Sequence, residues 1–323
     1  MTSLETVPAL LLALLIDAVV GDPNWLYRRV PHPVVIIGNA IGWLDRGWNK
    51  PSFSDPVRRG LGVIAVLVLL FGSACIGWLI HLVLRDVPYS MVLEAVVVSL
   101  FLAQNSLYRH VAAVEHGFLG GCLGPAQAAV ALIVGRDPTS LDEAGTCRAA
   151  IESLAENFSD GIVAPVFWFL LFGLPGLLAY KALNTADSMI GHRSEQYRAF
   201  GWASARLDDL ANLPPARLTA LAITIAAVSQ PNSSPSQAIT ATFRDARHHR
   251  SVNAGWPEAA MAGALGLRIA GPRRYDGILV EDAWMGNGRA AAAPDDIRRA
   301  LSLYVRACLV MVFVVALIET VLA

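Results

Sequence analysis

An apolar run of membrane length is the strongest constraint on this chain. Residues 61–84 read LGVIAVLVLLFGSACIGWLIHLVL and contain no Asp, Glu, Lys or Arg. An α-helix rises about 1.5 Å per residue, so this run reaches about 36 Å, which exceeds a hydrocarbon core of about 30 Å. We therefore expect residues 61–84 to form a membrane-spanning helix.

Composition extends this expectation to the rest of the chain. Of the 323 residues, 55% are hydrophobic and only 16% are charged, and the mean hydropathy is +0.50. A soluble domain carries about 25% charged residues to cover its surface. We predict an all-α, polytopic integral membrane protein that forms one membrane-embedded domain over residues 1–323, with helical extramembrane loops. The expected membrane segments are 7–20, 61–84, 90–104, 162–180, 216–229 and 303–323, and the larger polar loops are 21–60, 105–160, 181–215 and 230–302.

Several classes of function are disfavoured. The net charge of −1 and the lack of a basic patch with interleaved aromatic residues argue against nucleic-acid binding. The four cysteines form no CxxC pattern, which argues against a zinc site or a disulfide framework. No positive charge precedes the first apolar run, so we expect that run to stay as an anchor and not to be a cleaved signal. The sequence has no Walker A, HExxH, GxSxG or dinucleotide-binding pattern.

The segment 162–180 is apolar but interrupted. It reads IVAPVFWFLLFGLPGLLAY, with Gly173, Pro175 and Gly176 in its middle. Two half-helices of about ten residues each favour a re-entrant hairpin over a single crossing. A hairpin would bring Asp160, before the segment, close to Asn184 and Asp187 after it.

Polar residues on the N-terminal side of this segment follow helical spacing. Ser140 and Glu143 have the spacing of a capping box, which predicts a helix start. A stripe with a spacing of four then follows along one helix face, namely Arg148, Glu152, Glu156 and Asp160. Such a stripe is common as a solvated salt-bridge ladder. Because Asn157 and Asp160 stand directly before apolar sequence, where charge is costly, we favour a functional site.

Polar residues on the C-terminal side repeat this pattern. Lys181, Asn184 and Asp187 are spaced three apart, so one helix face presents an ammonium, an amide and a carboxylate. Further along, Asp208 and Asn212 are i,i+4 neighbours on a helix that Pro214 ends. We therefore expect residues 152–217 to hold the functional site.

Two features elsewhere stay open. Asp17 lies near the C-terminal end of the first helix, where the helix dipole disfavours a carboxylate, and Asp22 follows at a turn. Together they are either a site or residues at the membrane interface. His32, between two prolines, is expected to be structural. Ser234 precedes Pro235 and is expected to cap a helix.

Carboxylates, amides and basic residues are the available chemistry. Carboxylate oxygens suit Mg²⁺, which takes one or two of them together with water and substrate phosphates, and Lys and Arg neutralise phosphate. These residues predict Mg²⁺-dependent chemistry on a phosphorylated substrate at a membrane face. They do not separate an ATP-using ligase from a transferase that acts on a lipid diphosphate or CDP-alcohol. The transferase would need DxxxD motifs, which the chain lacks. A transporter with a broken-helix site is a third alternative.

Several long motifs resemble one known family. They run in order along nearly the whole chain: DAVVGDP (17–23), HPVVIIG (32–38), GRD (135–137), ESLAENFSDGIVAP (152–165), YKALNTADSMIGHR (180–193), FGWASARLDDLANLPPAR (200–217) and NAGWPEAAMAGALG (253–266). These segments resemble the adenosylcobinamide-phosphate synthase family of cobalamin (vitamin B12) biosynthesis.

This resemblance implies a multi-pass enzyme of the cell inner (plasma) membrane. Its expected reaction is the ATP- and Mg²⁺-dependent amide ligation of adenosylcobyric acid with (R)-1-aminopropan-2-ol or its O-phosphate, giving adenosylcobinamide (phosphate). By analogy the carboxylate is activated as an acyl phosphate, and an adenylate is the alternative. The expected partners are the corrinoid, the amine, the lipid bilayer and other corrinoid-pathway enzymes, with no nucleic acid.

Roles for individual residues follow as hypotheses. We expect Mg²⁺ ligands among Asp160, Asp187, Asp208 and Asp209. Phosphate would be held by Arg136, Lys181, Arg193 and Arg206. Substrate amides would be oriented by Asn157, Asn184 and Asn212. Glu152 or Glu156 would be the base that deprotonates the attacking ammonium.

Overall fold

The computed structural model describes residues 3–134, 140–275 and 278–322 and divides the chain into two compact units. The first unit holds Met1–Ala103, Ala164–Asn212 and Ala316–Ala323, and the second holds Gln104–Val163 and Leu213–Val315. The expected all-α class is confirmed, because helices dominate and the strands are only two or three residues long. The expectation of one membrane-embedded domain stays a prediction.

Four of the six expected membrane segments overlap described helices that are long and apolar enough to cross a membrane, and the bounds of the membrane segments stay a prediction. Among the described residues, four helical segments are long and apolar enough to cross a membrane, or five if the bent pair Trp202–Ala211 and Leu213–Ser229 is counted as one span. The four segments are Asp55–Leu84, Ser90–Gly117, Glu143–Ile190 and Pro294–Val321. The first helix is shorter, with an apolar part at Val7–Val19. These helices make the chain a multi-pass membrane protein.

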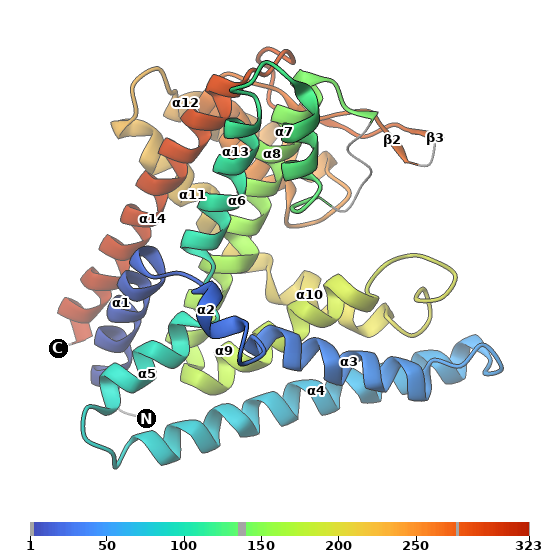
Figure 1. The fold of residues 1–323 in the computed structure, drawn as a ribbon, viewed down its shortest axis with the longest axis vertical. Coiled ribbons are helices and arrows are strands. Elements are labelled where there is room, and N and C mark those ends of the chain that lie inside the picture. Colours follow the sequence, from blue (N-terminus) through green and yellow to red (C-terminus); the bar gives the residue numbers. More distant parts are fainter. Residues whose placement is uncertain (1–2, 135–139, 276–277, 323) are drawn as a thin grey trace. The chain divides into compact units, whose positions relative to one another are not determined.

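The first unit is built from seven helices within the described residues and the end of an eighth. They are α1 (Ser3–Val19), α2 (Asn24–Tyr27), α3 (Pro33–Trp48), α4 (Asp55–Leu84), α5 (Ser90–Ser99), α9 (Ala164–Ile190) and α10 (Trp202–Ala211), joined by the C-terminal residues of α14 (Figure 1). Within this unit α1 packs on α5, and α9 packs on α3, α4 and α10.

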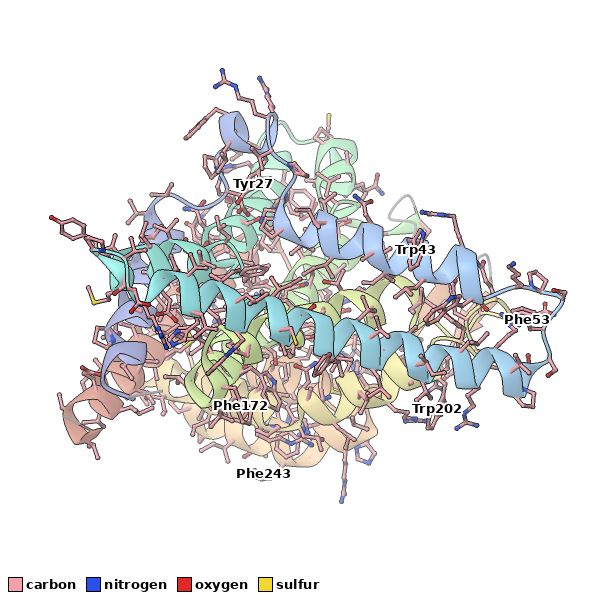
Figure 2. All side chains as sticks on the ribbon, turned by 90° about the horizontal axis from the view of Figure 1, so that it is seen from below. Tyr27, Trp43, Phe53, Phe172, Trp202 and Phe243 are labelled. Atoms are coloured by element: carbon pink, nitrogen blue, oxygen red, sulfur yellow. The ribbon has the colours of Figure 1, made fainter. Side chains whose placement is uncertain are left out.

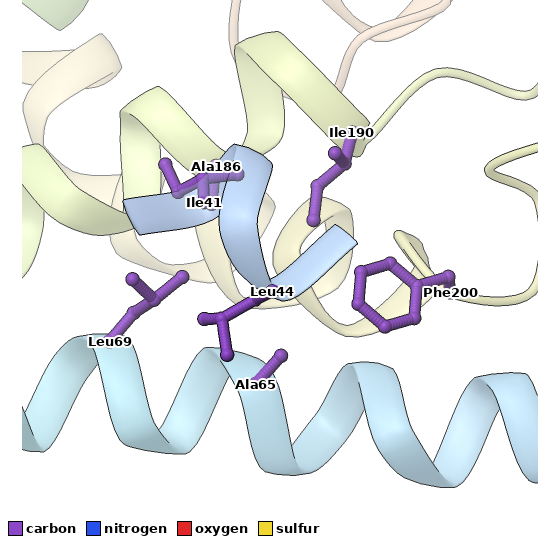
Figure 3. Packing of buried hydrophobic residues seen from close by; sticks show 7 residues of the cluster. All are labelled: Ile41, Leu44, Ala65, Leu69, Ala186, Ile190 and Phe200. Carbon is purple, nitrogen blue, oxygen red and sulfur yellow. The ribbon is translucent and has the colours of Figure 1, made fainter. Parts of the chain in front are cut away.

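A small apolar core joins three of these helices. Ile41 and Leu44 of α3 meet Ala65 and Leu69 of α4, and the loop residue Phe200 closes the cluster (Figure 3). Ala186 and Ile190 of α9 complete it. On the outside of the same unit large apolar side chains are exposed, including Phe71 and Leu67 of α4 and Trp43 of α3 (Figure 2). Exposed apolar surface of this extent suits contact with lipid.

Helix α9 is broken at Gly173, where the interrupted apolar segment predicted a break. Gly173 has φ 63° and ψ −151°, a backbone conformation that residues other than glycine rarely adopt. A Cβ on Gly176 would lie 2.5 Å from the carbonyl oxygen of Trp168. In an unbroken helix eight residues span about 12 Å, so the chain bends sharply between Trp168 and Gly176, and the re-entrant hairpin stays a prediction.

The second unit combines helices with two small antiparallel strand pairs. Its helices are α6 (Gln104–Gly117), α7 (Leu123–Val130), α8 (Glu143–Phe158), the π-helical segment η2 (Ser159–Val163), α11 (Leu213–Ser229), α12 (Pro235–Asp245), the 3₁₀ turn η3 (Ala246–His248), α13 (Gly255–Leu265) and α14 (Pro294–Leu322) through Val315. Strands β1 (Ile269–Ala270) and β4 (Trp284–Met285) pair, as do β2 (Arg273–Tyr275) and β3 (Ile278–Val280).

Small residues bring the helices of this unit close together. Helix α13 packs on α11 and α12, and its side chains are almost all buried. A Cβ on Gly263 would lie 2.4 Å from the carbonyl oxygen of Gln237 in α12. Close helix contact through small residues is typical of membrane proteins. Packing thus explains the small residues of the motif NAGWPEAAMAGALG.

Helix capping confirms one expectation and corrects another. The Ser234 side chain accepts a hydrogen bond from the Gln237 N–H at 3.2 Å and caps α12, as expected. Ser140 does not cap α8. The N-cap of α8 is Asp142, whose side chain accepts a hydrogen bond from the Gly145 N–H at 2.6 Å. The helix therefore starts at Glu143. A carboxylate close to the N-terminus of a helix also interacts favourably with the helix dipole.

Gly77 of α4 offers a test of how closely α4 packs against the break in α9. A Cβ at position 77 would lie 2.7 Å from the backbone of Leu174 and Pro175, at the break of α9. We expect Gly77→Ala to force backbone movement and to destabilise the protein by about 1–3 kcal/mol. The measurement is the thermal unfolding midpoint of purified protein in detergent.

The control is Gly72→Ala in the same helix, where a Cβ meets nothing within 4 Å. This change keeps or slightly raises the midpoint, because alanine favours helix over glycine by about 1 kcal/mol. An equal midpoint for Gly77→Ala and Gly72→Ala would contradict the close approach of α4 to the break.

Candidate active site

The clearest polar network of the first unit centres on Asp208. This residue lies in α10, and its carboxylate belongs to a side chain that is only 7% exposed. Asn212 donates to Asp208 Oδ2 from its amide nitrogen at 2.9 Å, and Asn184 of α9 donates to Oδ1 at 3.5 Å. The i,i+4 spacing of Asp208 and Asn212 and the helical face of Asn184 thus converge as expected.

Tyr180 is a member of this network that the residue spacing did not single out. Its hydroxyl donates to Asn212 Oδ1 at 2.9 Å, and Asn212 is only 1% exposed. Tyr180 lies one helical turn before Asn184 on α9, so its position on the same face was a usable signal. The phenol fixes the orientation of the Asn212 amide, which therefore presents its N–H groups to Asp208.

Tyr180 also lines an apolar pocket of about 550 Å³. Residues on both sides of the break in α9 contribute to the wall, together with α4 and α10. Trp168 donates from its indole nitrogen to the Ala211 carbonyl oxygen at 3.3 Å and thereby ties the part of α9 before the break to α10. The polar network is therefore bordered by an apolar wall, which limits its contact with water.

Three carboxylates come close together in this unit. Asp187, at the end of α9, and Asp208 and Asp209, on α10, lie near enough to interact electrostatically. A Cβ on Gly191 would lie 1.9 Å from Asp187 Oδ1, so only glycine leaves room for this carboxylate. Arg206 pairs with Asp209 at 3.3 Å. Like charges at close range favour a bound cation.

These carboxylates fit an incomplete ligand set for Mg²⁺. Within the described residues, no group of three or more His, Cys, Asp or Glu side chains has the arrangement that holds a metal ion by itself. Mg²⁺ commonly takes only one or two carboxylates and completes its shell with water and phosphate oxygens. Asp187, Asp208 and Asp209 suit that incomplete role, and their assignment stays a prediction.

The two glutamates proposed as the base differ in their surroundings in the second unit. Glu152 of α8 is 6% exposed, and its Oε1 accepts the Ala270 N–H at 2.8 Å. Ala270 has φ 59°, so Glu152 holds a left-handed turn at the end of β1. Glu156, one turn further along α8, is exposed. Only Glu156 is accessible to a substrate.

Asn157 and Asp160, the two other candidates near the end of α8, are partly explained by the fold. Asn157 is exposed and donates to the Ser153 carbonyl oxygen at 2.9 Å. Asp160 lies in η2, where the π-helical turn shifts the register of side chains after α8. The expected approach of Asp160 to Asn184 and Asp187 stays a prediction.

The basic residues expected to bind phosphate are accessible where they are described. Lys181 is half-buried on α9, while Arg193 and Arg206 are exposed. Arg136 lies outside the described residues. Their contact with phosphate stays a prediction.

Comparison with known proteins agrees with the resemblance of the motifs. The CobD/Cbib protein family matches residues 10–304. A cobalamin biosynthesis protein CobD from Sinorhizobium sp is 55% identical over 318 residues, which cover 97% of this chain and 98% of that protein. Proteins with the same description from Rhizobium meliloti and Rhodobacter capsulatus are 52% and 46% identical; the alignments cover 97% of both chains in the first pair and 96% of both in the second. No solved structure matches this chain. From the family match and these identities, the chain belongs to the CobD/Cbib family.

Proposed function

We propose that this protein acts in cobalamin biosynthesis as an ATP- and Mg²⁺-dependent acid–amine ligase. It would join adenosylcobyric acid to (R)-1-aminopropan-2-ol or its O-phosphate and form adenosylcobinamide (phosphate). The observation that carries the proposal is the 55% identity, over nearly the whole of both chains, to a protein described as a cobalamin biosynthesis protein. We also propose that the membrane is the cell inner (plasma) membrane.

The carboxylate of the corrinoid must be activated before an amine can attack it. In the proposed reaction a carboxylate oxygen attacks the γ-phosphorus of ATP, ADP leaves, and an acyl phosphate forms. The amine nitrogen then attacks the acyl carbon after losing a proton, the amide bond forms, and phosphate leaves. An adenylate would serve the same purpose, with diphosphate leaving in the first step.

The residues of the first unit have the chemistry for the phosphate part of this reaction. Asp187, Asp208 and Asp209 would hold Mg²⁺, which neutralises charge on the transferred phosphoryl group. Lys181, Arg193 and Arg206, with Arg136, would bind phosphate oxygens. Asn184 and Asn212 hold Asp208 in place, and Asn184, which is only half-buried, retains donor and acceptor capacity for substrate amides.

Glu156 is the better of the two proposed bases. A base must reach the proton that it removes, and Glu156 is exposed whereas Glu152 is buried against the Ala270 N–H. Asn157, next to Glu156 and also exposed, would orient a corrinoid amide. Asp160 is retained as a proposed metal ligand.

The reaction itself is the primary test. Purified protein, incubated with adenosylcobyric acid, Mg-ATP and (R)-1-aminopropan-2-ol or its O-phosphate, should yield the amide and one ADP for each amide formed. Mass spectrometry of the corrinoid and an assay of ADP measure this outcome. Turnover of a lipid diphosphate or CDP-alcohol without amide formation would support the transferase instead, and substrate uptake into vesicles without chemistry would support a transporter.

The metal assignment predicts strong effects for neutral isosteres. We expect Asp187→Asn and Asp209→Asn each to lower kcat/KM for amide formation by at least about 100-fold and to raise the Mg²⁺ concentration that gives half-maximal rate. Asp86→Asn is the control, because Asp86 is exposed and pairs with the adjacent Arg85. Wild-type rates and Mg²⁺ dependence in both variants would remove these aspartates from the metal site.

The two glutamates should separate into a catalytic and a structural role. Glu156→Gln should keep the unfolding temperature and lower kcat by about 10²–10⁴-fold, the range of general base catalysis. Glu152→Gln should keep most activity, because an amide oxygen can still accept the Ala270 N–H. Glu152→Leu should cost about 1–3 kcal/mol in stability, since that N–H is left unsatisfied.

The measurements are steady-state rates and thermal unfolding of the same preparations. A larger loss of kcat in Glu152→Gln than in Glu156→Gln, at equal stability, would reverse the assignment.

A further inference from the structure

A second polar cluster lies between α1 and α3, in the first unit. Asp17 is on the last turn of α1 and is 2% exposed, and Asp22 follows at the turn after it. Tyr27 ends the short helix α2 (labelled in Figure 2), and His32 stands directly before α3. The proposed reaction assigns no role to any of these four residues.

The imidazole of His32 is held in one orientation. It is the N-cap of α3, and its Nδ1 accepts the Val34 N–H at 3.2 Å. A neutral imidazole with an accepting Nδ1 carries its proton on Nε2, and Nε2 lies 3.5 Å from Asp22 Oδ1. His32 therefore points an N–H toward the Asp22 carboxylate. It is not available as a base, because its accepting nitrogen is occupied by the backbone.

The hydroxyl of Tyr27 is buried without a partner. The ring of Tyr27 packs against His32 with centroids 4.6 Å apart. Its hydroxyl oxygen is inaccessible to water and has no hydrogen-bond partner among the described residues. Burial and the nearby charges of Asp22 and Asp17 raise the pKa of Tyr27, so the phenol stays neutral. A buried hydroxyl without a partner is costly, and a bound water or a ligand group can satisfy it.

The composition of the cluster selects the chemistry of that ligand. Asp17 and Asp22 supply two negative charges beside an aromatic ring, which is an environment for a cation. Asp17, Asp22 and His32 do not form a metal-binding group, since the described residues contain none. A primary ammonium instead donates three hydrogen bonds, which a carboxylate and a phenol oxygen can accept. The Asp22 side chain is 35% exposed, so a small ligand can reach it.

The cluster is also close to the proposed phosphate site. Helices α1 and α3 both pack on α9. A Cβ on Gly38 of α3 would lie 3.3 Å from Met189 Sδ, and Met189 is two residues after Asp187. Gly38 is six residues after His32, which corresponds to about 9 Å along the helix. The helix that His32 caps thus contacts the end of α9 that carries Asp187.

We propose that Asp22 and Tyr27, with Asp17 as a second negative charge, form a primary-ammonium subsite, and that His32 positions the Asp22 carboxylate. In the ligation this subsite binds the amino group of the amine co-substrate, an assignment that rests on the proposed function. Both forms of the amine share this ammonium group, so the subsite accepts either one.

Calorimetric titration of the full-length protein in detergent tests the subsite directly. The probes are (R)-1-aminopropan-2-ol, its O-phosphate and the neutral propane-1,2-diol. Both amines should bind at least about tenfold more tightly than the diol, the difference expected for a hydrogen bond to a charged group. Asp22→Asn should weaken both amines by about the same factor of ten or more. Equal binding of diol and amine, or wild-type affinity in Asp22→Asn, would overturn the subsite.

Tyr27→Phe separates binding from stability. Removal of a buried hydroxyl without a partner should raise the unfolding temperature of the ligand-free protein, while the affinity for both amines falls several-fold. A Tyr27 that only supports the fold would leave amine affinity unchanged, which would remove Tyr27 from the subsite. Asp55→Asn is the matched control for charge, because Asp55 is an exposed carboxylate of the same unit that pairs with Arg198 at 3.3 Å.

Kinetics distinguish failure of the subsite from failure of the proposed reaction. If both proposals hold, Asp22→Asn raises KM for the amine about tenfold and leaves KM for ATP unchanged. Amide formation with an unchanged amine KM in Asp22→Asn overturns the subsite and keeps the ligase. Amine binding that depends on Asp22, without amide formation by the wild-type protein, keeps the subsite and overturns the ligase.

Discussion

The buried Asp208 carboxylate is the interaction on which the polar part of the first unit depends. A carboxylate in apolar surroundings is costly unless donors surround it. Asn184 and Asn212 supply an amide N–H to each of its oxygens, and Tyr180 fixes Asn212. Apolar contacts between α9 and α10 are not directional, whereas these hydrogen bonds permit only one relative rotation of the two helices. The network therefore determines which faces of α9 and α10 meet.

The break at Gly173 makes that arrangement reachable. The chain must bend within α9 for Trp168 and Tyr180 to line one pocket with α10. The backbone at Gly173 adopts a conformation that favours glycine, and Gly77 of α4 leaves space for the chain that follows. A local break and a glycine about a hundred residues away thus act together. Either one without the other would leave the bend strained or unsupported.

Local features of the sequence were sufficient to predict part of this structure. The apolar runs predicted helices of membrane length, the glycines and proline at 173–176 predicted the break in α9, and the i,i+4 spacing predicted the pair Asp208 and Asn212. The prediction that Ser140 caps α8 was wrong, because Asp142, two residues later, places a carboxylate acceptor next to the first free N–H groups of the helix. Glu152 meets Ala270 across 118 positions of sequence, and helical spacing carries no information about such a contact. Tyr180 was missed for a related reason, since an aromatic residue in an apolar helix is ordinarily part of the core.

Whether a buried polar group serves the fold or a ligand depends on what satisfies it. Glu152 and Asp208 were both candidates because charge next to apolar sequence is costly, yet the chain supplies donors to each of them. For Glu152 the donor is the backbone N–H of the left-handed residue Ala270, so this structural hydrogen bond is sufficient to explain why a buried carboxylate stands at position 152. Asp208 is held by two side-chain amides and interacts electrostatically with two further carboxylates, so it keeps capacity for a cation. Among the residues that the structure describes, the Tyr27 hydroxyl has neither kind of partner, and a water or ligand bound there would offset the cost of its burial.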